Sequence, residues 1–400
     1  MDKPSLIILA AGKGTRLQPL TNTTPKPLIK IAGKLILEWN MENAYRYISE
    51  IVMVVGHLES LIRDYFGKSY KGVPIKYVTQ KKLNGNAVAL GLVKDVIGGS
   101  RLVIINGDDI YSKELFQKSF LGKDFLICRR QEDCSSVGAV KSNNGRLTEI
   151  VEKPKKFISN LANTGFYFVG SKIFQYCPKI KLSKRGEFEV TDLINLYAKD
   201  RFIKIIRNDM GSIPISYPWQ ILEATQKLFS GMKKSLILGK VEKGVTIKGK
   251  IFLGKGSIIK SGAYLEGNFY IGENCVIGPN CYLKGFAALG NNCFVGNGSE
   301  VVRSSLGNDV SLRHQSYVGD SIIGNTTNFG AGSKVANLRH DFKNIKMMIN
   351  NELTDTGRNK FGAVIGDGVK LGINTSVYPG VKIGSFKTTL PNEIVKKDLV

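Results

Sequence analysis

Two different hydrophobic periods divide the chain. Up to about residue 230, short runs of β-branched and other apolar residues alternate with segments in which apolar residues recur every three or four positions. Strands that alternate with helices in this way are typical of βαβ units, and they predict a mostly parallel sheet with helices on both faces. The predicted strands are Ser5–Leu9, Ile51–Val55, Ile75–Val78 and Leu102–Ile105, and the predicted helices are Leu35–Tyr47, Leu58–Phe66, Ala87–Val96 and, closing this half, Trp219–Gly231.

After about residue 240 the pattern changes to a repeat of six residues. An aliphatic side chain returns at every sixth position from Ile247 to Val301 and, after small shifts of register, the repeat continues to Ile383. Hexads of this kind are typical of a parallel β-helix, in which each short strand turns one aliphatic side chain inward. Residues 338–362 break the period, so we expect them to leave the coil as a loop, where solenoids often carry function.

Composition narrows the classes of function. The 400 residues exceed one ordinary domain, and 42% hydrophobic residues exclude global disorder. No stretch approaches the roughly 18 uncharged apolar residues of a membrane span, so no membrane partner is expected. The net charge of +24 suits anionic partners. Because no nucleic-acid-binding module is recognisable, small phosphorylated molecules are the expected partners.

The six cysteines are scattered without a C-x-x-C pair, and Met1–Pro4 leads directly into an apolar strand without a signal peptide. These features predict reduced thiols and a cytoplasmic location. Only three histidines are present, which makes a histidine-rich metal centre unexpected.

A glycine-rich loop follows the first predicted strand. Residues 9–21 read L-A-A-G-K-G-T-R-L-Q-P-L-T, and P-K-P-L follows at 25–28. Gly12 and Gly14 allow backbone N–H groups to approach an anion closely, while Arg16 and Lys26 add positive charge. The loop is neither a Walker P-loop nor a dinucleotide fingerprint, because their spacings are absent.

This loop resembles the signature of the sugar-1-phosphate nucleotidylyltransferases. The likeness continues through Gln80…Gly85-Asn86-Ala87, Asn106-Gly107-Asp108, Glu152-Lys153-Pro154 and Asn163-Thr164-Gly165. The resemblance implies a Rossmann-like α/β nucleotidyltransferase domain over residues 1–232. It also implies in-line attack of a sugar-1-phosphate oxygen on the α-phosphorus of UTP or dTTP, with release of pyrophosphate.

The same resemblance assigns roles residue by residue. The residues that it implies bind the nucleotide are Leu9, Ala11, Gly12, Gly14, Thr15, Gln80 and Gly85, and those that it implies bind the sugar phosphate are Gly138, Glu152, Lys153 and Asn163. Arg16 and Lys26 would stabilise the departing pyrophosphate. Asp108 would bind Mg²⁺, with Asp109 a close competitor.

Two positions depart from the family pattern. Asn86 replaces the usual threonine, and Pro214 stands where relatives often carry a second metal ligand before a P-W sequence. Proline has no side-chain ligand atom. Either the metal is held differently, with Asp209 as a conceivable substitute, or this half is slow or inactive.

A second cluster of polar residues interrupts the hexads. It contains His314, Tyr317, Asn328 and Asn337, followed by Lys343 and Lys346. Consecutive coils of a β-helix are only about 4.8 Å apart, so such residues can converge.

This half resembles the acetyltransferase domain of the archaeal-type bifunctional N-acetylglucosamine-1-phosphate uridylyltransferases/glucosamine-1-phosphate N-acetyltransferases. The matching segments are A-N-L-R at 336–339 and T-G-R-N-K-F-G-A-V-I-G-D at 356–367. The resemblance implies a left-handed parallel β-helix over residues 240–400, which usually forms a homotrimer and takes acetyl-CoA as acyl donor. His314 would act as general base on the amine of a hexosamine 1-phosphate, a task that suits imidazole.

The remaining residues of the cluster receive supporting roles from the same resemblance. Tyr317, Asn328 and Asn337 would orient the substrate, and Lys343 and Lys346 would meet its phosphate. Arg303 is a weaker candidate for the phosphate, and His340 is interpreted as an ordinary loop residue.

Three functions remain open at this level. The leading hypothesis is a two-domain enzyme that makes UDP-N-acetylglucosamine by acetylation and then Mg²⁺-dependent uridylyl transfer. The second is a glucose-1-phosphate thymidylyl- or uridylyltransferase whose β-helix is structural or regulatory. The third is a non-catalytic subunit with a decayed nucleotide pocket, favoured only by Pro214.

Overall fold

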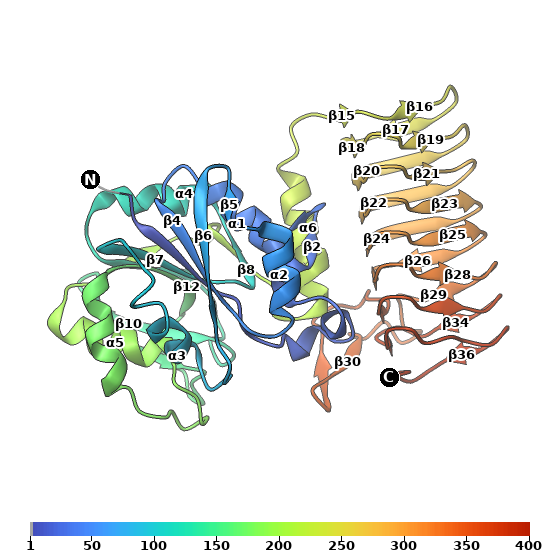
Figure 1. Ribbon diagram of the computed structural model, residues 1–400. Helices are drawn as coiled ribbons and strands as arrows, with labels where there is room; N and C mark the ends of the chain where they lie inside the picture. Colours follow the sequence, from blue (N-terminus) through green and yellow to red (C-terminus); the bar gives the residue numbers. More distant parts are fainter. Residues whose placement is uncertain (1–2) are drawn as a thin grey trace. The chain divides into compact units, whose positions relative to one another are not determined.

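The computed structural model describes residues 3–400, apart from the side chains at positions 120 and 121. The chain forms two compact units (Figure 1). The first contains the residues up to Lys13, Pro25–Leu28 and Ile36–Pro214, and the second contains Gly14–Thr24, Ile29–Leu35 and Ile215–Val400. No described helix has both the length and the apolar character needed to cross a membrane.

The first unit is built on a ten-stranded sheet whose centre is parallel. β6 (Val73–Thr79), β4 (Glu50–Val55), β1 (Ser5–Leu9) and β7 (Arg101–Asn106) lie side by side in that order. The buried aliphatic residues of β1, β4 and β7 form continuous runs, as expected for strands that are covered on both faces, whereas β6 is only partly buried. The four predicted strands are therefore confirmed, with ends displaced by at most two residues.

The outer half of the sheet is mixed, so the prediction of a mostly parallel sheet is wrong there. β12 (Leu161–Gly170) runs antiparallel to both β7 and β9 (Phe125–Arg130). β10 (Gly138–Asn143) and β11 (Arg146–Glu152) form a hairpin, whose turn residues Asn144 and Gly145 have φ of 47° and 74°. An Asn-Gly pair between two apolar runs favours a hairpin such as that of β10 and β11. The remaining strands of the sheet are β13 (Lys204–Arg207), parallel to β9, and β5 (Ser69–Tyr70), antiparallel to β6.

Helices complete the first unit. They are α1 (Ile36–Ala44), α2 (Glu59–Phe66), α3 (Asn86–Gly91), α4 (Lys113–Gln117) and α5 (Val190–Asp200). Three of them match predicted helices, but α3 ends five residues before the predicted end at Val96. α3 and α5 contribute Leu90 and Leu193, both fully buried, to one core with β1 and β7.

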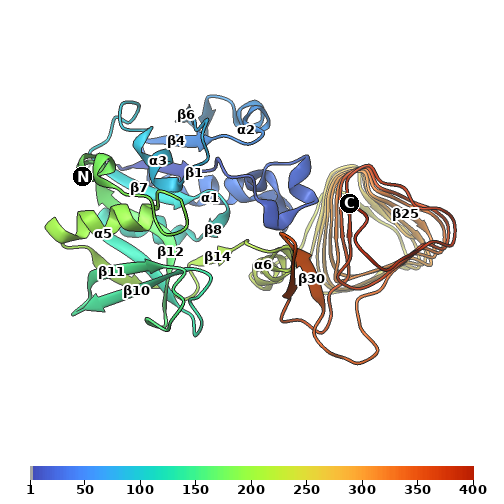
Figure 2. The same ribbon diagram turned by 90° about the horizontal axis from the view of Figure 1, so that it is seen from below.

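The second unit consists mainly of short parallel strands stacked one above another (Figure 1), and Figure 2 looks along this stack. Leu265, Leu283, Val301, Val318 and Val335 stand in register on successive strands and are all fully buried. The strands of this stack include β20 (Tyr264–Ile271), β22 (Tyr282–Leu289), β24 (Glu300–Leu306), β25 (Ser311–His314), β26 (Tyr317–Gly319), β27 (Ile322–Ile323), β28 (Asn328–Phe329), β29 (Lys334–Val335) and β32 (Val364–Ile365). The hexad residues thus form one apolar column, an arrangement consistent with a β-helix.

The predicted excursion at 338–362 leaves the stack and returns to it. β27 pairs in parallel with β32, which follows the excursion, so the stack of strands continues directly after it. Within the excursion, β30 (Lys346–Ile349) and β31 (Glu352–Asp355) form an antiparallel hairpin that the sequence did not predict.

Helix α6 (Pro218–Ser230) belongs by its packing to the second unit. It packs against β20, β22 and β24, and its Trp219 ring meets Phe361 edge-on at 6.3 Å. The helix that was expected to close the first half therefore packs against the coil instead.

Candidate active sites

The loop after β1 is held close to the ends of its neighbouring strands. The N–H of Gly107, just after β7, donates to the Leu9 carbonyl at 2.8 Å. A Cβ at Gly107 would lie 2.8 Å from the Ala10 side chain, and a Cβ at Gly56, after β4, would lie 2.9 Å from the Ala11 carbonyl. Glycine at both positions therefore allows the carboxyl ends of three parallel strands to converge on Leu9, Ala11 and Gly12, where ligands of α/β folds bind.

Lys26 and Asp108 form an ion pair at this edge of the first unit. The Lys26 ammonium contacts the Asp108 carboxylate, and only 9% of the lysine side chain is exposed against 42% for the aspartate. The structure thus brings together two residues that the sequence assigned to neighbouring roles. An anion that approaches Asp108 meets a fixed positive charge beside it.

Asp109 is held in place by a helix. It opens the short strand β8 (Asp109–Tyr111), and the buried Asn40 of α1 donates to the Asp109 carbonyl at 2.7 Å and accepts from the Tyr111 N–H at 2.8 Å. β8 pairs antiparallel with β14 (Ser212–Pro214), which places Pro214 directly opposite Asp109. The position opposite Asp109 is therefore occupied by a proline, which has no side-chain ligand atom.

These residues fit Mg²⁺ only in part. Proteins usually hold Mg²⁺ through one or two carboxylates together with substrate phosphates and water. Asp108 supplies one accessible carboxylate, and the described residues contain no group of three or more histidine, cysteine or acidic side chains that could hold a metal ion. The donor set suits a metal ion that arrives with the nucleotide.

Asp209 is held by two arginine residues. Its carboxylate accepts hydrogen bonds from the Arg207 guanidinium at 2.9 and 3.0 Å and from the Arg130 backbone N–H at 2.7 Å. These contacts lower the pKa of Asp209 to about 2. Both carboxylate oxygens of Asp209 are thus engaged by Arg207, and one of them also by Arg130.

The residues assigned to the sugar converge. A Cβ on Gly138 would lie 3.2 Å from a Glu152 oxygen and 3.3 Å from the Asn163 Cβ, so the absence of a side chain there leaves room between them. The Asn163 amide donates to the Tyr167 hydroxyl. Burial raises the pKa of Glu152, although Lys153 and Arg185 oppose the shift. The site is therefore a carboxyl and an amide facing a small gap beside β10.

The segment assigned to the base is fixed by α5. The Gln80 amide donates to the Gly85 carbonyl at 2.9 Å, and a Cβ at Gly85 would lie 2.2 Å from the Phe188 carbonyl. Asn86, which departs from the family pattern, accepts from the Val190 N–H at 2.6 Å. Its amide therefore satisfies the first N–H of α5, which gives this replacement a structural reason.

Arg16, with Gly14 and Thr15, belongs to the second unit. Its guanidinium lies 5.3 Å from the centre of the Tyr217 ring, which is stacked on Trp219 at 4.6 Å. Gly14 has φ of 65° and starts the turn Thr15–Leu17. The Tyr217 ring therefore offers the Arg16 guanidinium a cation–π contact.

A buried carboxylate organises the second cluster. Asp320 is completely buried; its two oxygens accept from the Arg303 guanidinium, both at 2.7 Å, and one of them also accepts from the Asn337 amide at 2.6 Å. Arg303, Asp320 and Asn337 are each 17 residues apart, so they stand on successive coils. Arg303, expected as a phosphate ligand, is instead engaged by this carboxylate.

Tyr317 joins this cluster. A Cβ on Gly319 would lie 2.6 Å from both the Tyr317 hydroxyl and the Asn337 amide, so the glycine lets these two groups share one space. Burial and the nearby carboxylates of Glu300 and Asp320 raise the pKa of Tyr317. The hydroxyl consequently stays protonated and can donate a hydrogen bond.

His314 ends β25, and Tyr317, three residues later in the chain, begins β26. The His314 side chain is exposed, and its carbonyl accepts from the Gly332 N–H of the next coil at 3.1 Å. Asn328 pairs with Ser311 in the register of β25 and β28, three residues along the strand from the level of His314. Asn328 therefore lies on the neighbouring strand, offset from His314 by about 10 Å along the strand direction.

Lys343 and Lys346 lie exposed on the excursion, Lys346 at the start of β30. The same excursion carries Arg358, which approaches Asp320 at 3.9 Å and Glu223 of α6 at 3.4 Å.

Sequence reasoning missed Asp320 and Arg358 as members of the site. The signal for Asp320 was present: an acidic residue stands one 17-residue coil after Arg303 and one before Asn337. No comparable spacing marks Arg358, because it lies outside the hexad repeat.

The two units thus combine a nucleotide-type site at a strand edge with a polar cluster on stacked coils, a combination of two transferase sites. The chain belongs to the nucleotidyl transferase family, whose profile matches residues 5–220, and within it to the bifunctional sugar-1-phosphate nucleotidylyltransferase/acetyltransferases. It is accordingly an enzyme of both transfer classes. The profile of the GMPPB C-terminal domain matches residues 265–388.

Its relatives are similar over nearly their whole length. The bifunctional sugar-1-phosphate nucleotidylyltransferase/acetyltransferase of Sulfurisphaera tokodaii is 38% identical over 98% of this chain and 97% of that protein. The bifunctional protein GlmU of Methanocaldococcus jannaschii is 39% identical over 95% of this chain and 91% of that protein. A solved structure from Bacillus anthracis, described as a glucose-1-phosphate thymidylyltransferase in complex with sucrose, covers 58% of this chain and 97% of its own with 29% identity and a TM-score of 0.51.

Proposed function

We propose that the enzyme converts glucosamine 1-phosphate to UDP-N-acetylglucosamine in two transfers. The first takes place on a left-handed parallel β-helix over residues 240–400 and the second in a nucleotidyltransferase domain over residues 1–232. The observation that carries this assignment is the cluster of Tyr317, Asn337 and Asp320 next to His314. The buried Asp320 carboxylate, held by Arg303 and Asn337, supports a site at this place because it fixes the Asn337 amide beside the Tyr317 hydroxyl.

In the acetyl transfer, the amine nitrogen of the sugar forms a bond to the thioester carbon of acetyl-CoA, and the carbon–sulfur bond breaks. His314 accepts the proton from the nitrogen, and the sulfur leaves as the thiol of CoA. Tyr317 and Asn337 donate hydrogen bonds to the oxygen that gains negative charge. Asn328, Lys343 and Lys346 bind the sugar and its phosphate from the surrounding surface.

In the uridylyl transfer, a phosphate oxygen of the sugar bonds to the α-phosphorus of UTP, and the bond to pyrophosphate breaks. The backbone of Leu9, Ala11, Gly12, Gly14 and Thr15 carries the triphosphate, Gln80 and Gly85 contact the base, and Gly138, Glu152, Lys153 and Asn163 bind the sugar phosphate. Arg16 and Lys26 neutralise the charge on the leaving pyrophosphate. Asp108 would hold Mg²⁺, which supplies further neutralisation of the triphosphate when bound.

We further propose a cytoplasmic homotrimer. The six free cysteines support a reducing compartment. Exposed side chains of the last coils, Tyr378, Phe386 and Leu390, provide apolar surface for association. A sedimentation mass of three chains is the expected result.

A substrate panel tests the function directly. Glucosamine 1-phosphate with acetyl-CoA should release free thiol. N-acetylglucosamine 1-phosphate with UTP should release pyrophosphate when Mg²⁺ is present, and faster than glucose 1-phosphate with dTTP. Absence of thiol release would overturn the first transfer, and absence of pyrophosphate from every sugar and nucleotide would overturn the second.

A further inference from the structure

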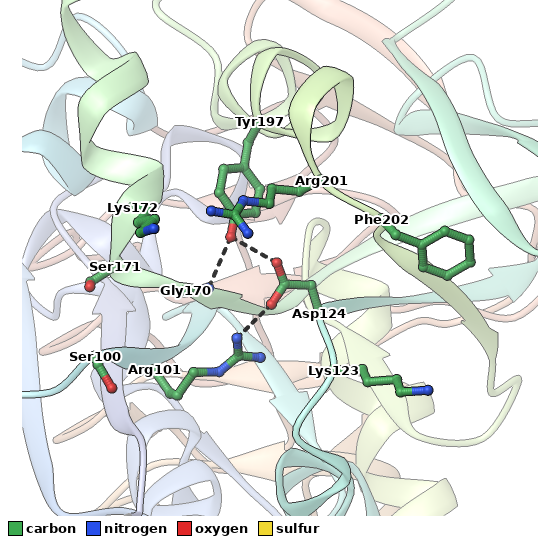
Figure 3. Close-up of a pocket in the computed structure, with 10 residues that line it drawn as sticks. All are labelled: Ser100, Arg101, Lys123, Asp124, Gly170, Ser171, Lys172, Tyr197, Arg201 and Phe202. Atoms are coloured by element: carbon green, nitrogen blue, oxygen red, sulfur yellow. Dashed lines mark hydrogen bonds and ion pairs between the residues drawn. The ribbon is translucent and has the colours of Figure 1, made fainter.

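A pocket of about 620 Å³ opens at the edge of the first unit where β7 begins (Figure 3). Its walls come from the start of β7, the loop before β9, the end of β12 and the end of α5. The charged residues that line it are Arg101, Lys123, Asp124, Lys172 and Arg201. The volume lies in the range of small-molecule sites, about 300–1,000 Å³.

The single carboxylate of the pocket is already satisfied. Asp124 accepts from Arg101 at 2.7 Å and from the Tyr197 hydroxyl at 2.7 Å, and only 10% of its side chain is exposed. The Tyr197 hydroxyl in turn accepts from the Gly170 N–H at 3.3 Å. Asp124 therefore fixes the floor of the pocket and leaves no free negative charge in it.

Three cations remain. Lys123, Lys172 and Arg201 are exposed, and within residues 3–400 none of them forms an ion pair with a carboxylate. Arg201 directly follows the last residue of α5, where the helix end favours a cation. Phe202 lines the same pocket with 56% of its surface exposed. Positive charge gathered beside an apolar ring is the combination that small organic phosphates require.

The pocket is remote from the candidate catalytic edge of the same unit. Arg101 begins β7, whereas Asp108 follows its end, so the two residues are separated by the length of the strand. Seven residues of extended chain span roughly 23 Å. A ligand in the pocket would therefore not be a substrate bound at Asp108.

The pocket also has room to extend. A neighbouring hollow of about 1,010 Å³ shares Ser100 and Arg101 with it and is lined by Lys3 and Lys76. The two hollows meet at Arg101.

We propose that this pocket binds the phosphate group of a small metabolite between Lys123, Lys172 and Arg201, as a second anion site distinct from both transfer sites. In a ligand larger than phosphate itself, the rest of the molecule lies against Phe202. Two sources share this chemistry: free inorganic phosphate, and the phosphates of a nucleotide sugar.

Site-resolved protection of arginine tests the proposal on the full-length enzyme. Phenylglyoxal modification of Arg201 is followed by mass spectrometry, with exposed Arg130 as the internal control and sodium chloride of equal ionic strength as the reference. Inorganic phosphate and UDP-N-acetylglucosamine are added in separate arms. We expect at least one of them to slow modification of Arg201 by about tenfold and to leave Arg130 unchanged.

A matched pair of variants locates the effect. The double variant Lys123→Ala/Lys172→Ala should lose the protection of Arg201, whereas Lys199→Ala, which removes a lysine from the last turn of α5 outside this pocket, should retain it. Protection by phosphate alone identifies free phosphate as the ligand, and protection by the nucleotide sugar at lower concentration identifies the metabolite. Equal modification with chloride and with both ligands, or protection that survives the double variant, overturns the proposal whether or not the two transfers are found.

Discussion

Pro214 lies directly opposite Asp109 across the antiparallel pair of β14 and β8. Side chains paired in this way have Cβ atoms about 4.5–5.5 Å apart. A carboxylate at position 214 would therefore stand close to Asp109, the residue that follows Asp108 in the chain. There it could bind the metal ion that the nucleotide also binds. The proline thus removes a ligand without removing the strand pair that would present it.

Pro214→Asp should therefore lower the Mg²⁺ concentration needed for half-maximal pyrophosphate release by about tenfold, because a second carboxylate adds charge to the metal site. Pyrophosphate is measured across a Mg²⁺ titration. Pro214→Ala is the matched control, since it restores the backbone N–H without adding a carboxylate, and it should behave like the wild type. Equal curves for both variants would show that position 214 does not reach the metal.

Asp320 should act as a positioning residue for acetyl transfer. Asp320→Asn removes the charge that holds Arg303 and Asn337, so we expect kcat for CoA release to fall by up to roughly 100-fold, as small displacements in a site can cause. Pyrophosphate release, measured in the same sample, should stay within about twofold. Asp309→Asn, an exposed aspartate that accepts from Asn292 at 3.0 Å, is the control and should change neither rate. A loss of both activities in Asp320→Asn would indicate general unfolding instead.

The architecture of the second unit could be predicted because its repeat is one-dimensional. Each coil contacts its neighbours. Aliphatic residues that recur in the hexad repeat, such as Leu265, Leu283 and Val301, therefore predict both the strands and the register in which they pair. The hairpin inside the excursion could not be predicted in the same way, since Lys346–Ile349 and Glu352–Asp355 pair with each other and not with the repeat.

The first unit was harder, because sequence order does not give strand direction. β12 inserts between β7 and β9 and runs antiparallel to both, which local periodicity cannot show. Motif residues were predicted better than their partners. The Lys26–Asp108 pair joins two recognised motifs. The buried Asn40 is far from Asp109 in the chain and lies in no recognised motif, so its hydrogen bond to the Asp109 carbonyl had no local signal.

His314→Ala should abolish thiol release from acetyl-CoA in the presence of glucosamine 1-phosphate. Loss of a general base lowers rates by about 10²–10⁴-fold. Pyrophosphate release from UTP should be unchanged, because the exposed His314 ends β25 and has no role in the proposed uridylyl transfer. His340→Ala, on the excursion, serves as the control and should keep thiol release. Equal release by His314→Ala and the wild type would remove His314 from the mechanism.

Glu152 should make the first unit less stable as pH rises. Burial raises the pKa of this carboxyl in the folded state above its value in the unfolded chain. Between the two pKa values the folded state binds more protons, so the free energy of unfolding decreases with increasing pH, and above the folded pKa the full cost of the buried charge remains. Glu152→Gln imitates the protonated form. The variant should therefore unfold at a higher temperature than the wild type at pH 7.5 and show a smaller gain near pH 4.5, while its KM for the sugar phosphate increases.

Glu149→Gln, an exposed carboxylate of the same strand paired with Lys141, is the control and should show no such pH-dependent gain. Thermal unfolding across this pH range measures the effect, and a gain that is the same at both pH values would contradict a cost of the charge at Glu152.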